Sequence, residues 1–229
     1  MARIATREDW LDARKALLEE EKAFQKARDA LAAKRRALPW VAVETDYRFH
    51  GPEGEMSLRD LFGDHDQLIV QHFMMGADWE EGCPSCSFWA DGFDGTTAHM
   101  AARDTAFVAV STAPLDRIEA YKARMGWDFP WVSCAGSSFN EDFHVTFAGD
   151  GGSYNYRPKQ GDHSELPGIS VFAREGDAVY HSYSTYARGL DNMNVTYQYL
   201  DLTPKGRDED DLPWPMAWVR RHDRYGDQP

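Results

Sequence analysis

Two cysteines three residues apart are the residues of this sequence best suited to chemistry. Cys83 and Cys86 lie in the segment WEEGCPSC, and the sequence of 229 residues holds one further cysteine, Cys134. A close pair of thiols can exchange with disulfides, because a thiolate attacks a disulfide sulfur and the second thiol then releases the product. The pair could also supply two of the four ligands of a structural zinc site. A third alternative is that the cysteines are incidental to a domain that only binds a partner.

The residues around the pair favour redox chemistry. Pro84 suits the first position of a helix, where a missing N–H costs nothing. Cys83 would then lie at the helix N-terminus, where unpaired N–H groups and the helix dipole favour the thiolate. Cys86 would lie on the same side of the first turn. We therefore expect Cys83 to be the attacking thiol and Cys86 the resolving thiol.

Acidic residues just before the pair predict an opposing effect. Asp78, Glu80 and Glu81 precede Cys83 closely in the sequence. Negative charge near a thiol raises its pKa. We therefore predict that Cys83 is less acidic than the thiols of strongly oxidising proteins of this kind, so that a pKa well below about 6 would contradict the prediction.

A zinc site would need more ligands than the pair provides. Cys134 and a histidine such as His72, His99 or His144 would have to complete it. We expect no metal and no cofactor. We interpret His72 as a core histidine rather than a proton relay, and Cys134 as a small buried hydrophobe.

The segments that must position the pair alternate between strands and helices. Strands are predicted over residues 41–49, 67–75, 105–112, 131–134, 168–174 and 178–185, and helices over residues 57–62, 84–103, 114–125 and 188–200. Strands that alternate with helices indicate parallel crossovers, and a closing hairpin makes the sheet mixed. We therefore predict an α/β, thioredoxin-like fold with a mixed central sheet flanked by helices and an elaborated C-terminus.

A long helix is predicted before this domain, over residues 6–38. We expect residues 1–38 to form a helical extension and residues 39–229 to form the thioredoxin-like domain. Apolar residues recur every seven positions along the helix, at Trp10, Leu17, Phe24 and Leu31. Such a seam packs against another surface. That surface is either the chain's own domain or a second copy of the chain, so a homodimer is an open alternative.

Two residues before the strand 168–174 belong to the predicted substrate groove. Thioredoxin-like proteins place a cis-proline beside the thiol pair, and the backbone of the preceding residue pairs with the substrate chain. We predict that Pro167 is this proline and that Leu166 is the pairing residue. Trp79 and Pro84 are expected to complete the groove.

The composition limits the partners. The net charge of −13 disfavours nucleic acid, which needs a basic surface, and we interpret Arg220 and Arg221 as part of a solvated face. No apolar run approaches the roughly 18 residues of a membrane-spanning helix. We expect a cytoplasmic protein that binds neither nucleic acid nor membrane. The common hydrolase and nucleotide-binding motifs are not found in the sequence.

Several long motifs resemble those of the DUF899 family. They are DWEEGCPSCSFWADGFDG at 78–95, RMGWDFPWVS at 124–133, HSYSTYARGLD at 181–191 and LDLTPKGRDEDDLPWPMAWVRRHDRY at 200–225. The resemblance covers nearly the whole chain. It implies a thioredoxin-like fold and a dithiol–disulfide oxidoreductase whose redox pair falls on Cys83 and Cys86.

We therefore predict a thiol–disulfide oxidoreductase with a Cys-Pro-Ser-Cys redox pair, acting on a protein or small-molecule thiol or disulfide. A peroxiredoxin-like thiol peroxidase is the second interpretation, because residues 47–73 are similar to the entry segment of peroxiredoxins. Glu80 stands where peroxiredoxins carry a threonine that helps to bind peroxide, which counts against this interpretation. A non-enzymatic thioredoxin-fold binding protein is the third.

Overall fold

A computed structural model describes residues 4–149 and 151–226. The chain divides into two compact units, the first ending at Pro39 and the second beginning at Trp40. Within the described residues, no helix is both long enough and apolar enough to cross a membrane.

The first unit is one long helix, α1, from Arg7 to Arg36. Thr6 is its N-cap, and the Thr6 hydroxyl accepts a hydrogen bond of 3.1 Å from the Asp9 backbone N–H. Such a cap satisfies one of the N–H groups that a helix start leaves unpaired. Basic residues fill the last turn, where they complement the helix dipole. The helix predicted over residues 6–38 is confirmed.

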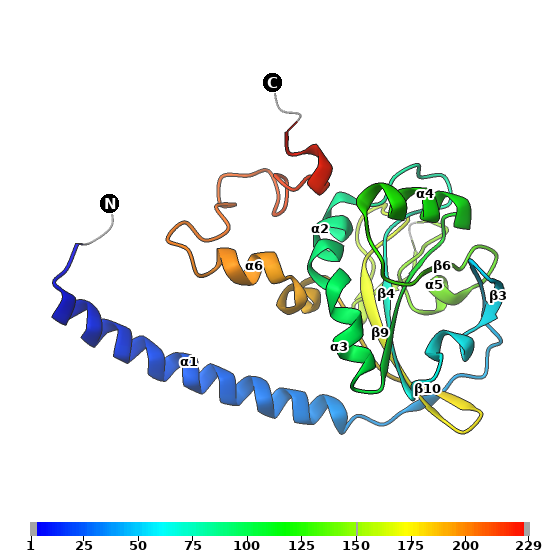
Figure 1. Cartoon of the computed structure of the whole chain (residues 1–229), viewed down its shortest axis with the longest axis horizontal. Helices are drawn as coiled ribbons and strands as arrows, with labels where there is room; N and C mark the ends of the chain where they lie inside the picture. The colour runs from blue at the N-terminus through cyan, green and yellow to red at the C-terminus, as the bar shows by residue number, and fades with distance from the viewer. Residues whose placement is uncertain (1–3, 150, 227–229) are drawn as a thin grey trace. The chain divides into compact units, whose positions relative to one another are not determined.

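The second unit is built on a mixed sheet. Its described part contains eight strands in the order β1-β10-β9-β4-β5-β6-β2-β3, and Figure 1 labels β3, β4, β6, β9 and β10 among them. Their bounds are β1 Val41–Ala42, β2 Arg48–Gly51, β3 Gly54–Ser57, β4 Gln67–His72, β5 Thr105–Ser111, β6 Trp131–Ser133, β9 Gly168–Glu175 and β10 Ala178–Tyr186. Strand β4 pairs in parallel with β5 and antiparallel with β9. The predicted mixed, thioredoxin-like sheet with its closing β9–β10 hairpin is therefore confirmed.

Helices and short helical turns lie between the strands and after the last strand, β10. They are η1 Asp60–Phe62, α2 Pro84–Phe93, η2 Asp94–Thr96, α3 Thr97–Ala101, α4 Leu115–Met125, α5 Phe139–Asp142, η3 Ala187–Met193, α6 Val195–Leu200 and η4 His222–Arg224. A separate small hairpin pairs β7 Ser153–Tyr154 with β8 Arg157–Pro158.

Three predicted elements are interrupted. The helix expected over residues 84–103 breaks at η2, because the Asp94 carboxylate turns away to accept the backbone N–H groups of Asp128 and Phe129. The helix expected over 188–200 breaks at Asn194, which caps α6. The strand expected over 41–49 splits into the separate strands β1 and β2.

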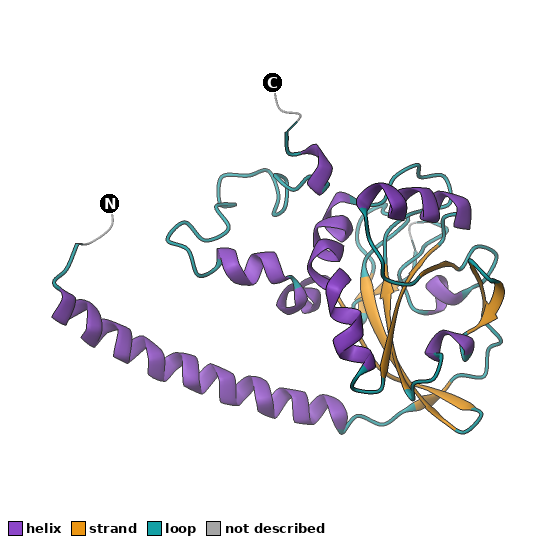
Figure 2. Cartoon of the chain, viewed as in Figure 1, coloured by secondary structure: helices purple, strands orange, loops and turns teal. Residues whose placement is uncertain are grey.

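Each face of the sheet carries its own apolar core, as the alternation of side chains along a strand requires. Phe107 and Ala109 of β5 face the core that α2 and α4 cover. Val108 and Val110 face the opposite core, which η1 and α5 cover. Figure 2 shows these helices on the two sides of the strands. The sheet thus holds α2 rigidly by its buried face, and α2 carries the thiol pair.

Candidate active site

The thiol pair lies at the start of α2, as the sequence predicted. Cys83 is the N-cap residue and Pro84 takes the first position of the helix. The Cys83 N–H donates to the Met74 carbonyl at 2.9 Å, which ties the pair to the chain leaving β4. The Ser87 hydroxyl donates to the Cys83 carbonyl at 2.8 Å. Cys83 is half-buried and Cys86 is buried, and both are free thiols.

The two thiols have opposite acidities. A hydrogen bond from the Cys86 thiol, together with backbone N–H groups of Cys86 and Ser85, lowers the pKa of Cys83 to about 6 in spite of its burial. The same hydrogen bond, with burial, raises the pKa of Cys86 well above its usual range. A helix N-terminus favours the anion in the same way. Cys83 is thus the more acidic thiol of the pair, and Cys86 is the one that holds its proton more tightly.

One of the acidic residues before the pair is itself paired with arginines. Arg124, Arg221 and Arg224 all pair with Glu81, and the Arg221 contact measures 2.9 Å. These guanidinium groups, Arg124 first, lower the pKa of Glu81. The charge of Glu81 is therefore offset by arginines, and the pKa of Cys83 lies below its usual value. That the pair is less acidic than strongly oxidising ones stays a prediction.

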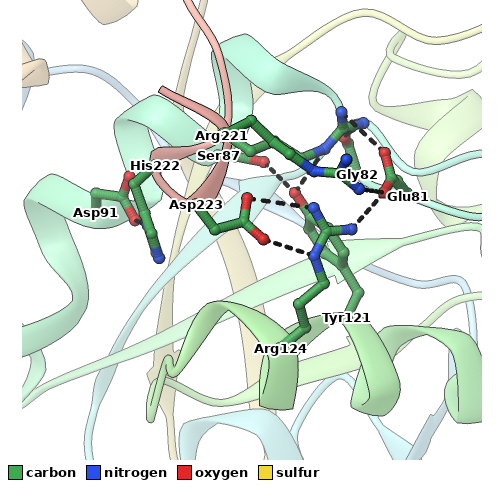
Figure 3. Close-up of polar contacts among 10 residues, drawn as sticks. Glu81, Gly82, Ser87, Asp91, Tyr121, Arg124, Arg221, His222 and Asp223 are labelled. Carbon is green, nitrogen blue, oxygen red and sulfur yellow. Dashed lines mark hydrogen bonds and ion pairs between the residues drawn. The ribbon is translucent and has the colours of Figure 1, made fainter. Parts of the chain in front are cut away.

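Arg221 connects the C-terminal segment, residues 201–226, to the thiol loop, residues 73–83 between β4 and α2 (Figure 3). Its guanidinium donates to the Gly82 carbonyl at 2.7 Å and to the Tyr121 hydroxyl at 3.1 Å. The Tyr121 hydroxyl in turn bonds the Ser87 hydroxyl at 2.7 Å. The positive charge of Arg221 also lowers the pKa of Cys83. The interpretation of Arg221 as a solvated residue is wrong, since its side chain is only 19% exposed.

The neighbours of Arg221 are fixed as well. Asp223 pairs with Arg124 of α4 at 2.8 Å. His222 bonds Asp91 of α2 at 2.7 Å, and Asp91 also accepts the Trp127 indole N–H at 2.8 Å. The C-terminal segment is therefore anchored to both helices that frame the thiol pair. No local pattern in the sequence indicates these contacts, because they join residues about a hundred positions apart.

A cavity of about 300 Å³ opens beside Cys86, and Cys83 is not part of its lining. Its lining includes Met74, Cys86, Trp89, Pro167, Leu190 and Met216. These residues come from the thioredoxin-like core and from the elaborated C-terminus. A larger cavity of about 670 Å³ is lined by other residues, among them Phe62 and Trp131, and includes neither cysteine of the pair. We therefore place the candidate site in the smaller cavity.

Only one of the predicted groove residues lines the cavity beside Cys86. Pro167 lines the cavity with Cys86, whereas Trp79, Pro84 and Leu166 are not part of its lining. Pro167 is not a cis-proline, since every peptide bond of the described residues is trans, so that prediction is wrong. The Pro167 carbonyl accepts the Tyr154 hydroxyl at 2.7 Å, a contact from the β7–β8 hairpin that holds the segment in place.

Trp79 and Pro84 have local roles. The Trp79 backbone N–H donates to the Gly76 carbonyl at 3.0 Å, and its ring lies against Gly76, where an added Cβ would approach the indole to 3.0 Å. Trp79 thus closes a turn within the thiol loop. Pro84 starts α2. Leu166 pairs with the chain's own backbone, because its N–H donates to the Val145 carbonyl at 2.8 Å.

Other titratable groups near the sheet are buried and satisfied. His72 bonds Asn140 and Ser170, each at 2.9 Å, and burial lowers its pKa to about 4, so it is a core histidine as predicted. Burial raises the pKa of Cys134 to about 12. Among the described residues, no cluster of three or more histidine, cysteine and acidic side chains could hold a metal ion. The zinc alternative therefore has no geometric support.

The sequence did not predict a role for the Glu165 side chain near the candidate site. This carboxyl is 5% exposed, and the hydroxyl of Thr112 donates to it at 2.8 Å. Thr146 donates to both of its oxygens. Burial raises the pKa of Glu165 to about 7. Glu165 immediately precedes Leu166 and Pro167, so its threonine contacts help to fix the segment beside the cavity.

Fold and site together define a thioredoxin-like protein with a dithiol at a helix N-terminus. Within that class the chain belongs to the DUF899 family, whose model, described as a bacterial protein of unknown function, matches residues 1–225. The resemblance of its motifs to that family is therefore confirmed. Among curated proteins, no sequence matches this chain.

Solved structures of similar fold include peroxiredoxins. The chain is similar to peroxidoxin BcpB from Mycobacterium tuberculosis, with 17% identity and a TM-score of 0.46, over 71% of this chain and 97% of that one. It is similar to a mutant of PrxQ from Xylella fastidiosa, with 10% identity and a TM-score of 0.47, over 70% and 95% of the two chains. Peroxiredoxin Q from Xanthomonas campestris matches with 15% identity and a TM-score of 0.44, over 68% and 94%.

Proposed function

We propose that this protein is a thiol–disulfide oxidoreductase in which Cys83 attacks and Cys86 resolves. The observation that carries the proposal is the position of the two thiols at the start of α2, with Cys83 as the N-cap residue and Cys86 buried in the first turn, and the directions of their pKa shifts support it. The thiolate is the attacking species in thiol–disulfide exchange, so a lowered pKa makes Cys83 reactive at neutral pH. Cys86 is buried and stays protonated, so it reacts only after Cys83 has formed the mixed disulfide with the substrate.

The reaction consists of two exchanges. The Cys83 thiolate attacks one sulfur of the substrate disulfide, a Cys83–substrate disulfide bond forms, and the other substrate sulfur leaves as a thiolate. Cys86 then gives up its proton to water and attacks the Cys83 sulfur, and the second substrate thiolate leaves. Two electrons pass from the dithiol to the substrate, and the released thiolates take up protons. The reverse sequence oxidises a dithiol substrate.

Three cysteine variants test this proposal. Cys83→Ser should abolish disulfide reduction, because no attacking thiolate remains. Cys86→Ser should trap a mixed disulfide on Cys83, detectable by mass spectrometry. Cys134→Ser is the matched control and should retain activity, since Cys134 is fully buried apart from the pair. Retained activity in Cys83→Ser would refute the assigned role.

A thiol peroxidase is the second candidate. The same low pKa of Cys83 suits attack on a peroxide O–O bond, which gives a Cys83 sulfenic acid and an alcohol or water. Cys86 would then form the disulfide and release water. Peroxide consumption that requires Cys83 and is at least as fast as disulfide reduction would favour this candidate over the first.

We also propose a homodimer through α1 and a cytoplasmic location. The apolar residues Trp10, Leu17, Phe24 and Leu31 form a heptad seam along α1. A heptad seam on such a helix fits a second copy of the same helix. Light scattering should give twice the chain mass, and the Phe24→Glu variant should give the mass of a single chain.

The proposed cytoplasmic location fits the same chemistry, because a reducing compartment would keep the pair available for exchange.

A further inference from the structure

The cavity beside Cys86 presents mainly apolar surface, and several of the polar groups in its lining are already paired within the protein. The Trp89 indole N–H donates to the Met193 carbonyl at 3.0 Å. The Asn194 side-chain oxygen accepts the Tyr197 N–H at 3.2 Å. The Asp191 carboxylate accepts two hydrogen bonds from the Arg207 guanidinium, at 3.0 and 2.9 Å. These groups have their partners, so the apolar side chains remain as the surface that meets a ligand.

A charged end of a ligand would have to stay at the mouth of this cavity. Arg188 is 82% exposed and pairs with Asp191 at 3.5 Å. Its guanidinium therefore remains in water rather than inside the cavity. Met74, Trp89, Leu190 and Met216 provide the interior surface. An apolar group gains free energy by leaving water for such a surface, whereas an unpaired polar group loses it.

The backbone edge that a protein substrate would use is occupied by the chain itself. An extended peptide binds to a sheet edge by pairing with unused backbone N–H and C=O groups. Here the Leu166 N–H donates to the Val145 carbonyl at 2.8 Å, and the Phe147 N–H donates to the Ser164 carbonyl at 2.9 Å. Thr146 and Glu165 form an antiparallel bridge between these two contacts. Pairing of a substrate chain at Leu166 would require this internal pairing to open.

We propose that the cavity receives the organic group of a small apolar disulfide, and that low-molecular-weight disulfides rather than extended protein chains are the substrates. The inference rests on the proposed thiol–disulfide exchange and specifies its substrate class. A volume of about 300 Å³ is at the small end of ligand pockets, and it suits a short alkyl or phenyl group. Because Cys86 lines the cavity and Cys83 does not, the disulfide bond would extend from the cavity towards Cys83 while the apolar group is buried.

The overall reaction balances with no other reactant than solvent. One reduced protein and one disulfide R–S–S–R give the Cys83–Cys86 disulfide and two R–SH. One proton of the two released thiols comes from Cys86 and the other from water, because Cys83 reacts as the thiolate. A single turnover of the reduced protein therefore measures the substrate preference directly, without any electron donor.

Two matched disulfides provide the test. Dipropyl disulfide and bis(2-hydroxyethyl) disulfide have the same number of heavy atoms and differ in a terminal methyl or hydroxyl group. Each is mixed with reduced full-length protein, and the remaining thiols are alkylated at intervals and counted by mass spectrometry. Rate constants are divided by those of free dithiothreitol with the same disulfide, to remove intrinsic reactivity. We expect dipropyl disulfide to react at least about ten-fold faster after this correction.

A third arm uses the disulfides of insulin as an extended protein substrate. We expect a corrected rate constant below that of dipropyl disulfide. Equal corrected rates for the two small disulfides, or a faster reaction with insulin, would overturn the substrate class but leave the exchange activity intact. If neither of the two small disulfides nor insulin oxidises the pair, the proposed function itself is refuted.

A pair of tryptophan variants locates the preference in the cavity. Met216→Trp adds volume to the cavity lining and should reduce the ten-fold preference to less than about two-fold, with the hydroxyethyl compound little affected. Leu202→Trp is the control, because Leu202 is 82% exposed and is not part of the lining. A merely structural effect of Met216→Trp would slow both disulfides equally. An unchanged preference in Met216→Trp would place the apolar group elsewhere and contradict the proposal.

Discussion

Removing the Cys86 thiol should raise the pKa of Cys83 more than any other single change. The hydrogen bond from Cys86 is the largest of the causes that lower this pKa to about 6. Hydrogen bonds to charged groups contribute about 1.5–3 kcal/mol, and one pKa unit corresponds to about 1.4 kcal/mol. Cys86→Ala should therefore move the pKa of Cys83 from about 6 to roughly 7–8. Cys86→Ser keeps a hydroxyl donor and should cause a smaller rise.

The measurement is the pH dependence of thiolate absorbance in the ultraviolet, supported by the rate of Cys83 alkylation. Both variants are made in a Cys134→Ser background, so that Cys83 is the remaining thiol in each. Because the thiolate is the reactive form, the alkylation rate should rise with pH through the measured pKa. A pKa that stays near 6 in Cys86→Ala would refute the role of this hydrogen bond. Equal shifts in the alanine and serine variants would show that packing, not the donor, is responsible.

Three further substitutions test the surroundings of the pair. Arg221→Gln should raise the pKa of Cys83 by less than Cys86→Ala does, because its charge is the smallest of the causes given above, and Arg220→Gln should leave that pKa unchanged in the same titration. Glu165 has a folded pKa of about 7, above its ordinary 4.5, so its contribution to stability is present at pH 4.5 and is lost as pH rises through 7. In urea unfolding, the free energy of unfolding of the unmodified protein should therefore fall by at most about 3 kcal/mol between pH 4.5 and 7, and Glu165→Gln should not show this fall. A Glu165→Gln variant with the same pH profile as the unmodified protein would contradict the assignment. Gly82→Ala places a Cβ 2.6 and 2.7 Å from two aromatic rings and should destabilise the protein by about 1–3 kcal/mol, whereas Gly95→Ala meets no atom within 4 Å and serves as the control in thermal unfolding.

The local structure of the thiol pair follows from its own sequence. Pro84 after Cys83 sets the first turn of α2, and the apolar runs that become β4 and β5 bury both of their faces. The Glu175-Gly176-Asp177 segment predicts the β9–β10 hairpin, because Gly176 adopts the left-handed conformation that such a turn needs. These features depend on neighbours in the sequence, so a pattern in the sequence can reveal them.

The surroundings of the pair depend on contacts between distant residues. Arg221 reaches Gly82 from 139 positions away, and Leu166 pairs with Val145 across an insertion. Neither contact leaves a periodic pattern in the sequence. The sequence therefore predicted Arg221, one of the three arginines that pair with Glu81, to be an ordinary surface residue, and it predicted that the acidic segment opposes the thiolate. Asp94 ends α2 for the same reason, since its carboxylate serves backbone N–H groups of a later loop.

The redox potential of the Cys83–Cys86 pair tests the central claim most directly. The protein is equilibrated in glutathione redox buffers, its thiols are alkylated, and the fraction of intramolecular disulfide is read by mass spectrometry, with Cys134→Ser as the background. We expect a reversible disulfide between the two cysteines with a potential between about −120 and −270 mV, the range of exchange catalysts. If no disulfide forms between Cys83 and Cys86 in any buffer, the pair does not act in thiol–disulfide exchange.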